Sequence, residues 1–540
     1  MKLAPIALAM AMASASAAPM TDAQLQAIVD QRLVGDRTGA CLAVAVVEPS
    51  HVARSFRCAD PADAARIDAR TAFEIGSVTK TMTATLLADL IGQGKVSLDD
   101  PLGDYLPEGI GVPAYEGTPI LLRHLVTHTS GLPALPSQLA AGANPADPYA
   151  ALDEDALLAS LADVRLAQAP GTRFEYSNFG AMLLSYAVTR RAGSDLDALL
   201  REKLFAPLGM DGAHLGTPPA GVRAAVGHTP NGQPAPAWNF ATNLAGVGGV
   251  RATLEDMVRY VEGNLGLRES TILPALDLAQ RPVSEQPPMA MHWMLANANG
   301  RTVHVHEGGT GGFSSFVSVD RERQRGVVIL SDTTWNSIGS LGSLGLHLVD
   351  PAFPLGKPRK VAMPPAEVLD ALAGEYQLQG GMAMSLRVRD GKLFVQPAGQ
   401  DEYEMAYDDA GDFFPLAFDA VLRPQKKSDG YGFNWVQMGG VVPATRVGTP
   451  RAVALDEAQL QAYAGEYPLA PGFVLSVRAR DGRLHAQATG QGEFPLDATG
   501  PDRFEAATFG IDILFRRGAD GAVVSLELHQ GGRVTPAKRQ

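Results

Sequence analysis

The sequence predicts an α+β protein in which one large mixed domain is followed by two small antiparallel β-barrel domains. Three observations lead to this prediction. Residues 22 to about 350 mix helical and strand patterns, residues 354–366 form a proline-rich linker, and the remainder contains an internal repeat. We therefore expect domains at 18–353, 367–450 and 451–540. A chain of 540 residues exceeds the usual size of a single core, which agrees with several domains.

The large domain contains one nearly continuous apolar helix pattern, residues 81–91, which ends at the punctuation Gly92-Gln93-Gly94. A helix that is apolar on almost every side is expected to be buried in a core. Short apolar or alternating runs are expected to be strands or approach segments, and they lie at residues 43–47, 71–75, 302–306, 313–319 and 326–330.

The last third of the chain repeats itself in one register. Residues 373–376, Ala-Gly-Glu-Tyr, recur as residues 464–467, and residues 389–393 recur with the same spacing as residues 480–484. Each copy carries short alternating strands and an Asp-Gly pair, which is a strong hairpin signal, so two small barrels or sandwiches are expected. Within them, Tyr376 and Tyr467 are expected to be core residues. The copies are expected to serve size control and stability, and ligand binding in a barrel is the alternative.

Charge and the N-terminus restrict the compartment and the partners. The formal net charge of −13 argues against nucleic acid and against anionic membrane surfaces. Residues 1–17 combine Lys2, a short apolar run and a small-residue end, which predicts a signal peptide cleaved near Ala17; the alternative is a buried first helix. No later stretch reaches the roughly 18 apolar residues of a membrane span. The expected location is periplasmic or secreted.

The two cysteines, Cys41 and Cys58, lie at equal distances from the turn pair Pro49-Ser50. In a two-residue hairpin they would face each other, and an oxidising compartment would allow a disulfide. Two free buried thiols or a metal pair are the alternatives, although two ligands without further partners make a poor metal site.

The motif Ser77-Val78-Thr79-Lys80 precedes the apolar helix. Spacing of three residues on a helix places Ser77 and Lys80 on one face, and a serine needs such a neighbouring base to act as a nucleophile. Burial can lower the pKa of a lysine enough for it to serve as that base. Alone the motif is weak, because a surface pair produces the same letters.

Two further motifs accompany the motif at residues 77–80. Tyr176-Ser177-Asn178 in an extended loop would point the phenol and the amide the same way, where they could move a proton and hold a substrate carbonyl. The run His306-Glu307-Gly308-Gly309 joins two strand-like segments, and its glycines can free an N–H for an oxyanion. Taken singly, these would be a solvent-facing turn and an ordinary surface histidine.

The three motifs in this order resemble the serine β-lactamase and penicillin-binding-protein superfamily, and most of all its class C β-lactamase branch. The resemblance covers residues 22 to about 350. It implies a β-lactamase/transpeptidase-like domain, in which an antiparallel sheet is flanked by helices and joined to a helical subdomain. The stretch Leu125–Pro133, with His128, supports the resemblance, and His128 is expected to be a packing residue.

The resemblance also implies roles for the site residues. Ser77 would form an acyl-enzyme, while Lys80 and Tyr176 would share the general acid and base work. Asn178, His306 and Gly308 would bind substrate. The backbone N–H groups of Ser77 and Gly309 would form the oxyanion hole. No metal and no cofactor is implied.

The third motif departs from the lysine that lactamases usually carry, because His306 is largely neutral at pH 7 unless its environment perturbs it. This departure, together with barrel domains that resemble the lipocalin-type domains of D-aminopeptidases, predicts a peptidase or amidase on D-amino-acid-containing peptides, of D-aminopeptidase or D-Ala-D-Ala carboxypeptidase type. A carboxylesterase or weak β-lactamase is the first alternative, and a penicillin-binding or ligand-binding protein without turnover is the second. The expected partner is a small peptide, amide or ester, and oligomeric state stays open.

Overall fold

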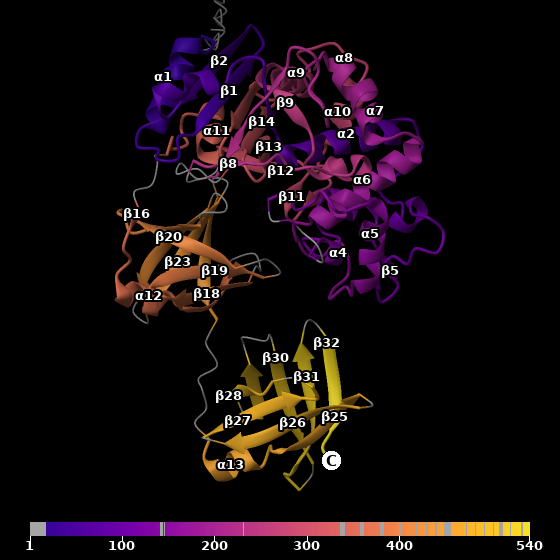
Figure 1. The fold of residues 1–540 in the computed structure, drawn as a ribbon, viewed down its shortest axis with the longest axis vertical. Helices are drawn as coiled ribbons and strands as arrows, with labels where there is room; N and C mark the ends of the chain where they lie inside the picture. The colour runs from indigo at the N-terminus through magenta and orange to yellow at the C-terminus, as the bar shows by residue number, and fades with distance from the viewer. Residues whose placement is uncertain are drawn as a thin grey trace, which may run out of the picture.

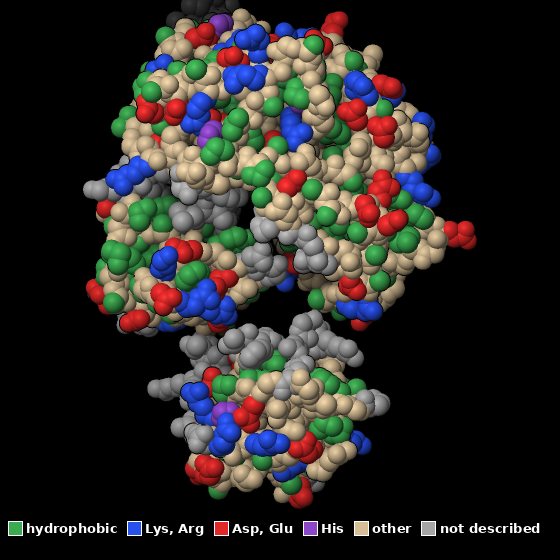
Figure 2. Space-filling model, in the orientation of Figure 1, with side chains coloured by type: hydrophobic (Ala, Val, Ile, Leu, Met, Phe, Trp, Pro, Cys, Tyr) green, Lys and Arg blue, Asp and Glu red, His purple; other side chains and the backbone are tan. Residues whose placement is uncertain are grey.

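A computed structural model describes residues 18–540 apart from short gaps (Figure 1). The gaps are 141–143, 145, 230–231, 335–340, 357–360, 379–382, 399–401, 416–419, 428–429, 438–439, 448–454, 471, 481, 491, 501, 507–510, 519 and 531–532. The predicted signal peptide, residues 1–17, lies outside the described residues. In the described part of the chain, no helix is long and apolar enough to cross a membrane. Acidic and basic side chains are interspersed over the face drawn in Figure 2.

The large domain is built on an eight-stranded antiparallel sheet with the strand order β10-β11-β12-β13-β14-β15-β1-β2. Its central strands are buried on both faces because helices cover both. The strands are β10 (Ser284–Glu285), β11 (Pro288–Met289), β12 (Met294–Ala298), β13 (Arg301–Gly309), β14 (Ser314–Asp320), β15 (Arg325–Ser331), β1 (Cys41–Glu48) and β2 (His51–Cys58). The predicted strands at 43–47, 302–306, 313–319 and 326–330 are thereby confirmed.

Alternate residues of β1 enter two different cores, as the period of two in a strand requires. Leu42, Val44 and Val46 pack with helices α1 (Asp22–Leu33) and α11 (Gly342–Val349). Ala43, Ala45 and Val47 belong to the larger core, which also contains helices α2 (Thr79–Gly92), α9 (Leu254–Leu265) and α10 (Leu273–Ala279). The sheet therefore forms the middle layer of the domain.

Helix α2 is the predicted apolar helix, and it ends at Gly92 as expected. It is preceded by the single turn η2 (Gly76–Val78) and by β3, the middle strand of a short three-stranded sheet in the order β6-β3-β9. The strands of this sheet are β6 (Arg223–Ala224), β3 (Thr71–Glu74) and β9 (Arg251–Thr253). Ile75 donates its N–H to the carbonyl of Val250 at 3.1 Å, which ties the residue before η2 to the start of β9.

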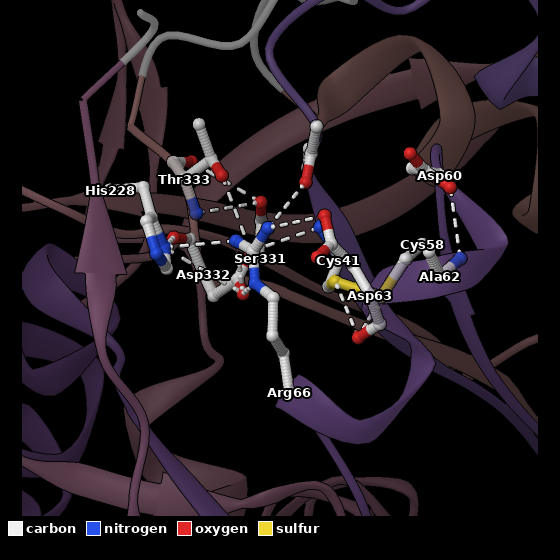
Figure 3. Close-up of a disulfide and its surroundings, with 12 residues drawn as sticks. Cys41, Cys58, Asp60, Ala62, Asp63, Arg66, His228, Ser331, Asp332 and Thr333 are labelled. Carbon is white, nitrogen blue, oxygen red and sulfur yellow. Dashed lines mark hydrogen bonds and ion pairs between the residues drawn. A yellow bond between two sulfur atoms is a disulfide. The ribbon is translucent and has the colours of Figure 1, made fainter. Parts of the chain in front are cut away.

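The predicted hairpin and disulfide are both present. In the pairing of β1 with β2, Cys41 stands opposite Cys58 and Glu48 stands opposite His51, and the two cysteines form a disulfide. Beside the disulfide, the buried carboxylate of Asp332 accepts the Cys41 N–H at 2.9 Å and pairs with Arg66 at 2.7 Å (Figure 3). This network joins the hairpin to the residue that follows β15.

The first repeat forms a closed barrel of eight antiparallel strands, because β20 pairs with β21 as well as with β19. A ninth strand, β16 (Val361–Ala362), pairs with β20, so part of the segment expected as linker adds to this sheet. The barrel strands are β17 (Gly374–Leu378), β18 (Ala383–Arg389), β19 (Lys392–Pro397), β20 (Tyr403–Asp408), β21 (Phe413–Pro415), β22 (Val421–Lys427), β23 (Gly430–Gln437) and β24 (Gly440–Arg446).

The second repeat is an eight-stranded antiparallel sheet in simple chain order from β25 to β32. Gln540 donates its N–H to the carbonyl of Glu466 at 2.9 Å, which brings the end of the chain beside β25 and nearly closes the barrel. The strands are β25 (Gly465–Ala470), β26 (Phe473–Arg480), β27 (Arg483–Ala488), β28 (Phe494–Gly500), β29 (Arg503–Ala506), β30 (Ile511–Arg517), β31 (Val523–Gln530) and β32 (Arg533–Lys538).

Equivalent tyrosines sit in the core of each barrel, as predicted. The Tyr376 hydroxyl donates to the carbonyl of Leu372, and the Tyr467 hydroxyl donates to that of Tyr463, both at 2.8 Å and both four residues back. Large apolar side chains pack around each tyrosine, including Phe433 in the first barrel and Phe515 in the second. Both barrel interiors are therefore packed cores. The predicted Asp-Gly turn is present at Asp390, where both residues have positive φ; its counterpart Asp481 lies outside the described residues.

Candidate active site

Ser77 is the middle residue of the turn η2, directly before α2. From residue 71 to residue 88 every side chain except that of Ser77 is buried. Gly76 makes this arrangement possible, since its φ of +50° suits a residue without a Cβ. The local fold thus presents one hydroxyl to the outside at the end of a buried helix.

Lys80 lies one turn further along, with its side chain fully buried. Its Nζ is 2.8 Å from Ser77 Oγ and 2.8 Å from the carbonyl oxygen of Val247. Among the residues that the structure describes, no carboxylate lies within ion-pair distance of this amine. Burial therefore holds the pKa of Lys80 well below its usual value of 10.5, because nothing nearby compensates the charged form. An uncharged amine beside a serine hydroxyl can accept its proton.

Tyr176 approaches the same serine from a separate segment of the chain. The Lys80 Nζ lies 5.1 Å from the centre of the Tyr176 ring. Burial raises the pKa of the Tyr176 phenol, and a hydrogen bond with Ser77 offsets part of that rise. The tyrosine therefore keeps its proton at neutral pH, which makes it an acid beside a base. The structure thus brings together Ser77, Lys80 and Tyr176.

Asn178 differs from expectation in its backbone, because it is the first residue of helix α6 (Asn178–Ala192) and not part of an extended loop. Ser177 is the reason: its hydroxyl caps the helix by accepting the Gly180 N–H at 2.9 Å. The Asn178 Nδ2 donates to the Tyr149 hydroxyl at 3.3 Å, while its Oδ1 is buried and has no protein partner in the described part of the chain. That oxygen therefore has an unused capacity to accept a hydrogen bond.

His306 lies near the end of β13 with only 1% of its surface exposed. Its Nδ1 is 2.7 Å from the carbonyl oxygen of Glu307, which can only accept, so the ring proton is on Nδ1. The other nitrogen, Nε2, is buried with no protein partner among the described residues. Burial, and to a lesser extent the nearby Lys80, lowers the pKa of His306 to about 3. This histidine is therefore neutral and offers a bare acceptor.

The glycines of the third motif allow β13 to touch the serine turn. A Cβ on Gly308 would collide with the carbonyl oxygen of Ile75, and a Cβ on Gly76 would lie 2.6 Å from the Gly309 nitrogen. Ser315 strengthens the same contact by donating its hydroxyl to the Ile75 carbonyl at 2.8 Å. Close packing of these two backbone segments thus explains why residue 308 is a glycine. Gly309 lies next to the turn that carries Ser77.

Several residues of the site carried no sequence signal. The carbonyl of Val247 holds Lys80, and an aromatic cluster adjoins Asn178. In that cluster Tyr149 stacks on Phe240 with ring centres 4.8 Å apart, and contacts Trp238 edge-on at 5.5 Å. Tyr149 lies in one loop, Trp238 and Phe240 lie in a second, and Val247 is the last residue of the turn η6 (Thr242–Val247). All lie outside the three motifs in sequence, so no spacing rule reveals them. Trp238 also lies against Gly311, where a Cβ would be 2.6 Å from its indole nitrogen.

Comparison with known proteins places the chain in a family. The model of the family described as Beta-lactamase matches residues 25–336, which is more than half of the chain. The chain belongs to the beta-lactamase family. Its fold and its motifs therefore identify a serine hydrolase of that family, as the sequence predicts. Residues 449–538 match a second family, described only as a domain of unknown function.

Individual proteins resemble the chain over about half of its length or more. The D-alanyl-D-alanine-carboxypeptidase/endopeptidase AmpH of Escherichia coli is 29% identical over 308 residues, which is 54% of this chain and 78% of that protein. A beta-lactamase of Escherichia coli K12 is 28% identical over 322 residues, 51% of this chain and 79% of that protein. An octameric penicillin-binding protein homologue from Pyrococcus abyssi shares the fold, with a TM-score of 0.52 and 16% identity over 86% of this chain and 98% of that one.

Proposed function

We propose that this beta-lactamase family protein hydrolyses peptides or amides that contain D-amino acids, through an acyl-enzyme on Ser77. The observation that carries the proposal is the fully buried Lys80 amine, 2.8 Å from the Ser77 hydroxyl, with the protonated Tyr176 phenol on the same serine. The name of the relative AmpH, a carboxypeptidase and endopeptidase on D-alanyl-D-alanine, supports the substrate class.

The chemistry follows from the two protonation states. Ser77 Oγ attacks the substrate carbonyl carbon as its proton passes to the neutral Lys80 amine. The oxyanion is held by the N–H groups of Ser77 and Gly309. When the C–N bond breaks, the leaving amine takes the phenol proton of Tyr176, and the Lys80 ammonium returns a proton to the tyrosinate. Water then attacks the ester carbonyl, its proton passes to the same base pair, and Ser77 regains its hydroxyl.

Neutral His306 narrows the substrate class within this proposal. A bare, buried Nε2 accepts a hydrogen bond and repels a carboxylate, whereas a lysine at this place would attract one. Substrates that present an N–H or an amide to His306 are therefore favoured over those with a free terminal carboxylate. Internal peptide bonds, amino-terminal D-residues and amides meet this condition.

The same observation favours a carboxylesterase as the second candidate. An ester substrate needs no cation at His306, and its alkoxide leaving group departs with less help from an acid than an amine does. A β-lactam antibiotic carries a carboxylate, so weak β-lactamase activity agrees less well with the neutral histidine.

We also propose that the protein works outside the cytoplasm, after removal of residues 1–17. The disulfide between Cys41 and Cys58 supports this, because such bonds persist in oxidising compartments. For the two barrels we propose a structural or size-limiting role, which their packed interiors support.

A matched substrate panel tests the proposal. We would compare two forms of a tripeptide that ends in D-alanyl-D-alanine, one with a free carboxylate and one with a C-terminal amide. The panel also contains a D-alanine anilide, a short nitrophenyl ester and a chromogenic cephalosporin. We expect turnover of D-amides, with the tripeptide amide favoured over the free acid, and a serine ester on Ser77 detected by mass spectrometry. No D-amide turnover alongside good ester turnover would establish the esterase instead, and labelling of a Ser77→Ala variant would refute the nucleophile.

A further inference from the structure

His128 follows the short helix α3 (Leu122–Val126) and is buried with a left-handed backbone, φ +53°. A positive φ is uncommon for a residue other than glycine, and it persists only where the surroundings determine it. Two hydrogen bonds hold this turn: the His128 N–H donates to the carbonyl of Leu125 at 3.2 Å, and the Thr129 N–H donates to that of His124 at 2.9 Å. The backbone of His128 is thus held in one conformation by its surroundings.

Three successive residues, 175 to 177, contact His128. Glu175 donates its N–H to the His128 carbonyl at 2.7 Å, and Ser177 donates its N–H to His128 Nδ1 at 3.2 Å. Between them, the ring of Tyr176 stacks on the imidazole, with centres 4.2 Å apart and planes inclined by 27°. One residue therefore holds the N–H groups of both residues that flank Tyr176 and one face of the Tyr176 ring.

The imidazole must be neutral to make these contacts, because Nδ1 accepts the Ser177 N–H and a protonated ring has no acceptor. Burial, followed by the nearby Lys80 and His306, keeps the pKa of His128 well below its usual value. Behind the ring lies a second buried histidine, His292, with ring centres 4.9 Å apart. His292 is itself anchored, since its N–H donates to the carbonyl of Val126 at 2.8 Å.

We propose that His128 is a positioning residue, which fixes the Tyr176 phenol beside Ser77 and Lys80 through two backbone hydrogen bonds and a ring contact. It takes no proton in the reaction. This inference rests on the proposed function, in which Tyr176 transfers a proton. It goes beyond the packing role expected from sequence, because the packing determines where an acid group stands.

Substitutions of His128 separate its hydrogen bond with Ser177 from its ring contact with Tyr176. Asparagine tolerates a positive φ, and its Oδ1 stands where Nδ1 stood, so His128→Asn keeps the acceptor for Ser177 and loses the ring contact. His128→Ala loses both. A displaced proton donor costs up to about 100-fold in rate, so we expect kcat to fall about tenfold in His128→Asn and about 100-fold in His128→Ala. KM should change less than threefold.

A double-mutant cycle with Tyr176→Phe decides between positioning and general damage. Once the hydroxyl is gone its position no longer matters, so His128→Ala should then lower kcat less than threefold. His304→Asn is the matched control: it removes another buried imidazole, which contacts the Gln280 carbonyl at 2.8 Å, and should leave kcat unchanged. Urea midpoints for every variant report the folded fraction.

The outcomes separate this inference from the proposed function. If Tyr176→Phe keeps full kcat, the proton-transfer role of Tyr176 fails, and the inference about His128 fails with it, while hydrolysis through Ser77 stands. If Tyr176→Phe is slow but His128→Ala costs the same factor in both backgrounds, only the positioning role is overturned. If His128→Ala does not fold, an unchanged kcat in His128→Asn overturns it equally.

Discussion

The Nδ1 of His306 points at the carbonyl oxygen of Glu307, 2.7 Å away, and this contact fixes which nitrogen of the ring faces the site. The unpaired lone pair of the buried Nε2 then decides what kind of group can lie beside it. A lysine at the same place would have offered protons instead of accepting one.

Replacing His306 by lysine should therefore shift substrate preference. We expect His306→Lys to raise kcat/KM for the free-acid D-tripeptide relative to its amide by about tenfold or more, since a hydrogen bond to a charged group is worth about 1.5–3 kcal/mol. His306→Gln, which stays neutral, serves as the control and should leave the ratio near its original value. An equal change for both substrates would contradict the assignment of His306 to substrate selection.

The uncharged state of Lys80 predicts that arginine cannot replace lysine as the base for Ser77. Arginine retains its proton in proteins, so Lys80→Arg keeps a hydrogen-bond donor near Ser77 but supplies no base. We expect acylation to slow by between about 100-fold and 10,000-fold, measured by labelling with a fluorophosphonate. Lys80→Met controls for simple loss of the amine and should be as slow. Rapid labelling of Lys80→Arg would mean that another group deprotonates Ser77.

The pH profile of kcat/KM should rise with pH in a range well below 10.5 and then remain flat. Lys80 must lose its proton to act as a base, so activity appears as the pH passes upward through its lowered pKa, which burial places below 10.5. Tyr176 must keep its proton, and its raised pKa keeps the phenol protonated beyond the ordinary value of 10. Stopped-time assays from pH 5 to 10.5 check this, and a fall in rate near pH 8 would contradict it.

The disulfide should stabilise the large domain without affecting the chemistry. The bond closes a loop with a sequence separation of 17 residues, for which loop-closure entropy gives about 3 kcal/mol. Reduction, or the double change Cys41→Ser with Cys58→Ser, should lower the free energy of unfolding by that amount and leave kcat unchanged. Urea denaturation with and without reductant measures the loss. The double variant must not respond to reductant, because it has no bond left to break.

Much of the framework could be predicted from sequence because it depends on local patterns. The apolar stretch 81–91 predicts α2, and the equal spacing of Cys41 and Cys58 from their turn predicts the register of the hairpin. The 91-residue spacing predicts two similar barrels, and each places its tyrosine in the same core position. Such patterns need no knowledge of what lies opposite in space.

The rest of the site depends on contacts that no local pattern encodes. His128 is one residue in the polar stretch 127–131, and only the folded chain shows that it contacts Tyr176. The helical start at Asn178 is set by the Ser177 cap, a feature that competes with the extended pattern expected there. The wall formed by Tyr149, Trp238 and Phe240 comes from separate loops, and the carbonyl of Val247 has no side-chain signature at all.

The position of β1 in the sheet has a consequence for how the chain folds during its synthesis. This strand pairs with β2 on one side and with β15 on the other, where Leu42 stands opposite Ser331. A growing chain can form the hairpin early, but the open edge of β1 has no partner until β15, which ends at Ser331, about 270 residues beyond Cys58, has been synthesised. Until then the apolar β1 is an unprotected edge of the kind that aggregates, so a chaperone that shields the nascent N-terminal hairpin should raise the yield of folded enzyme.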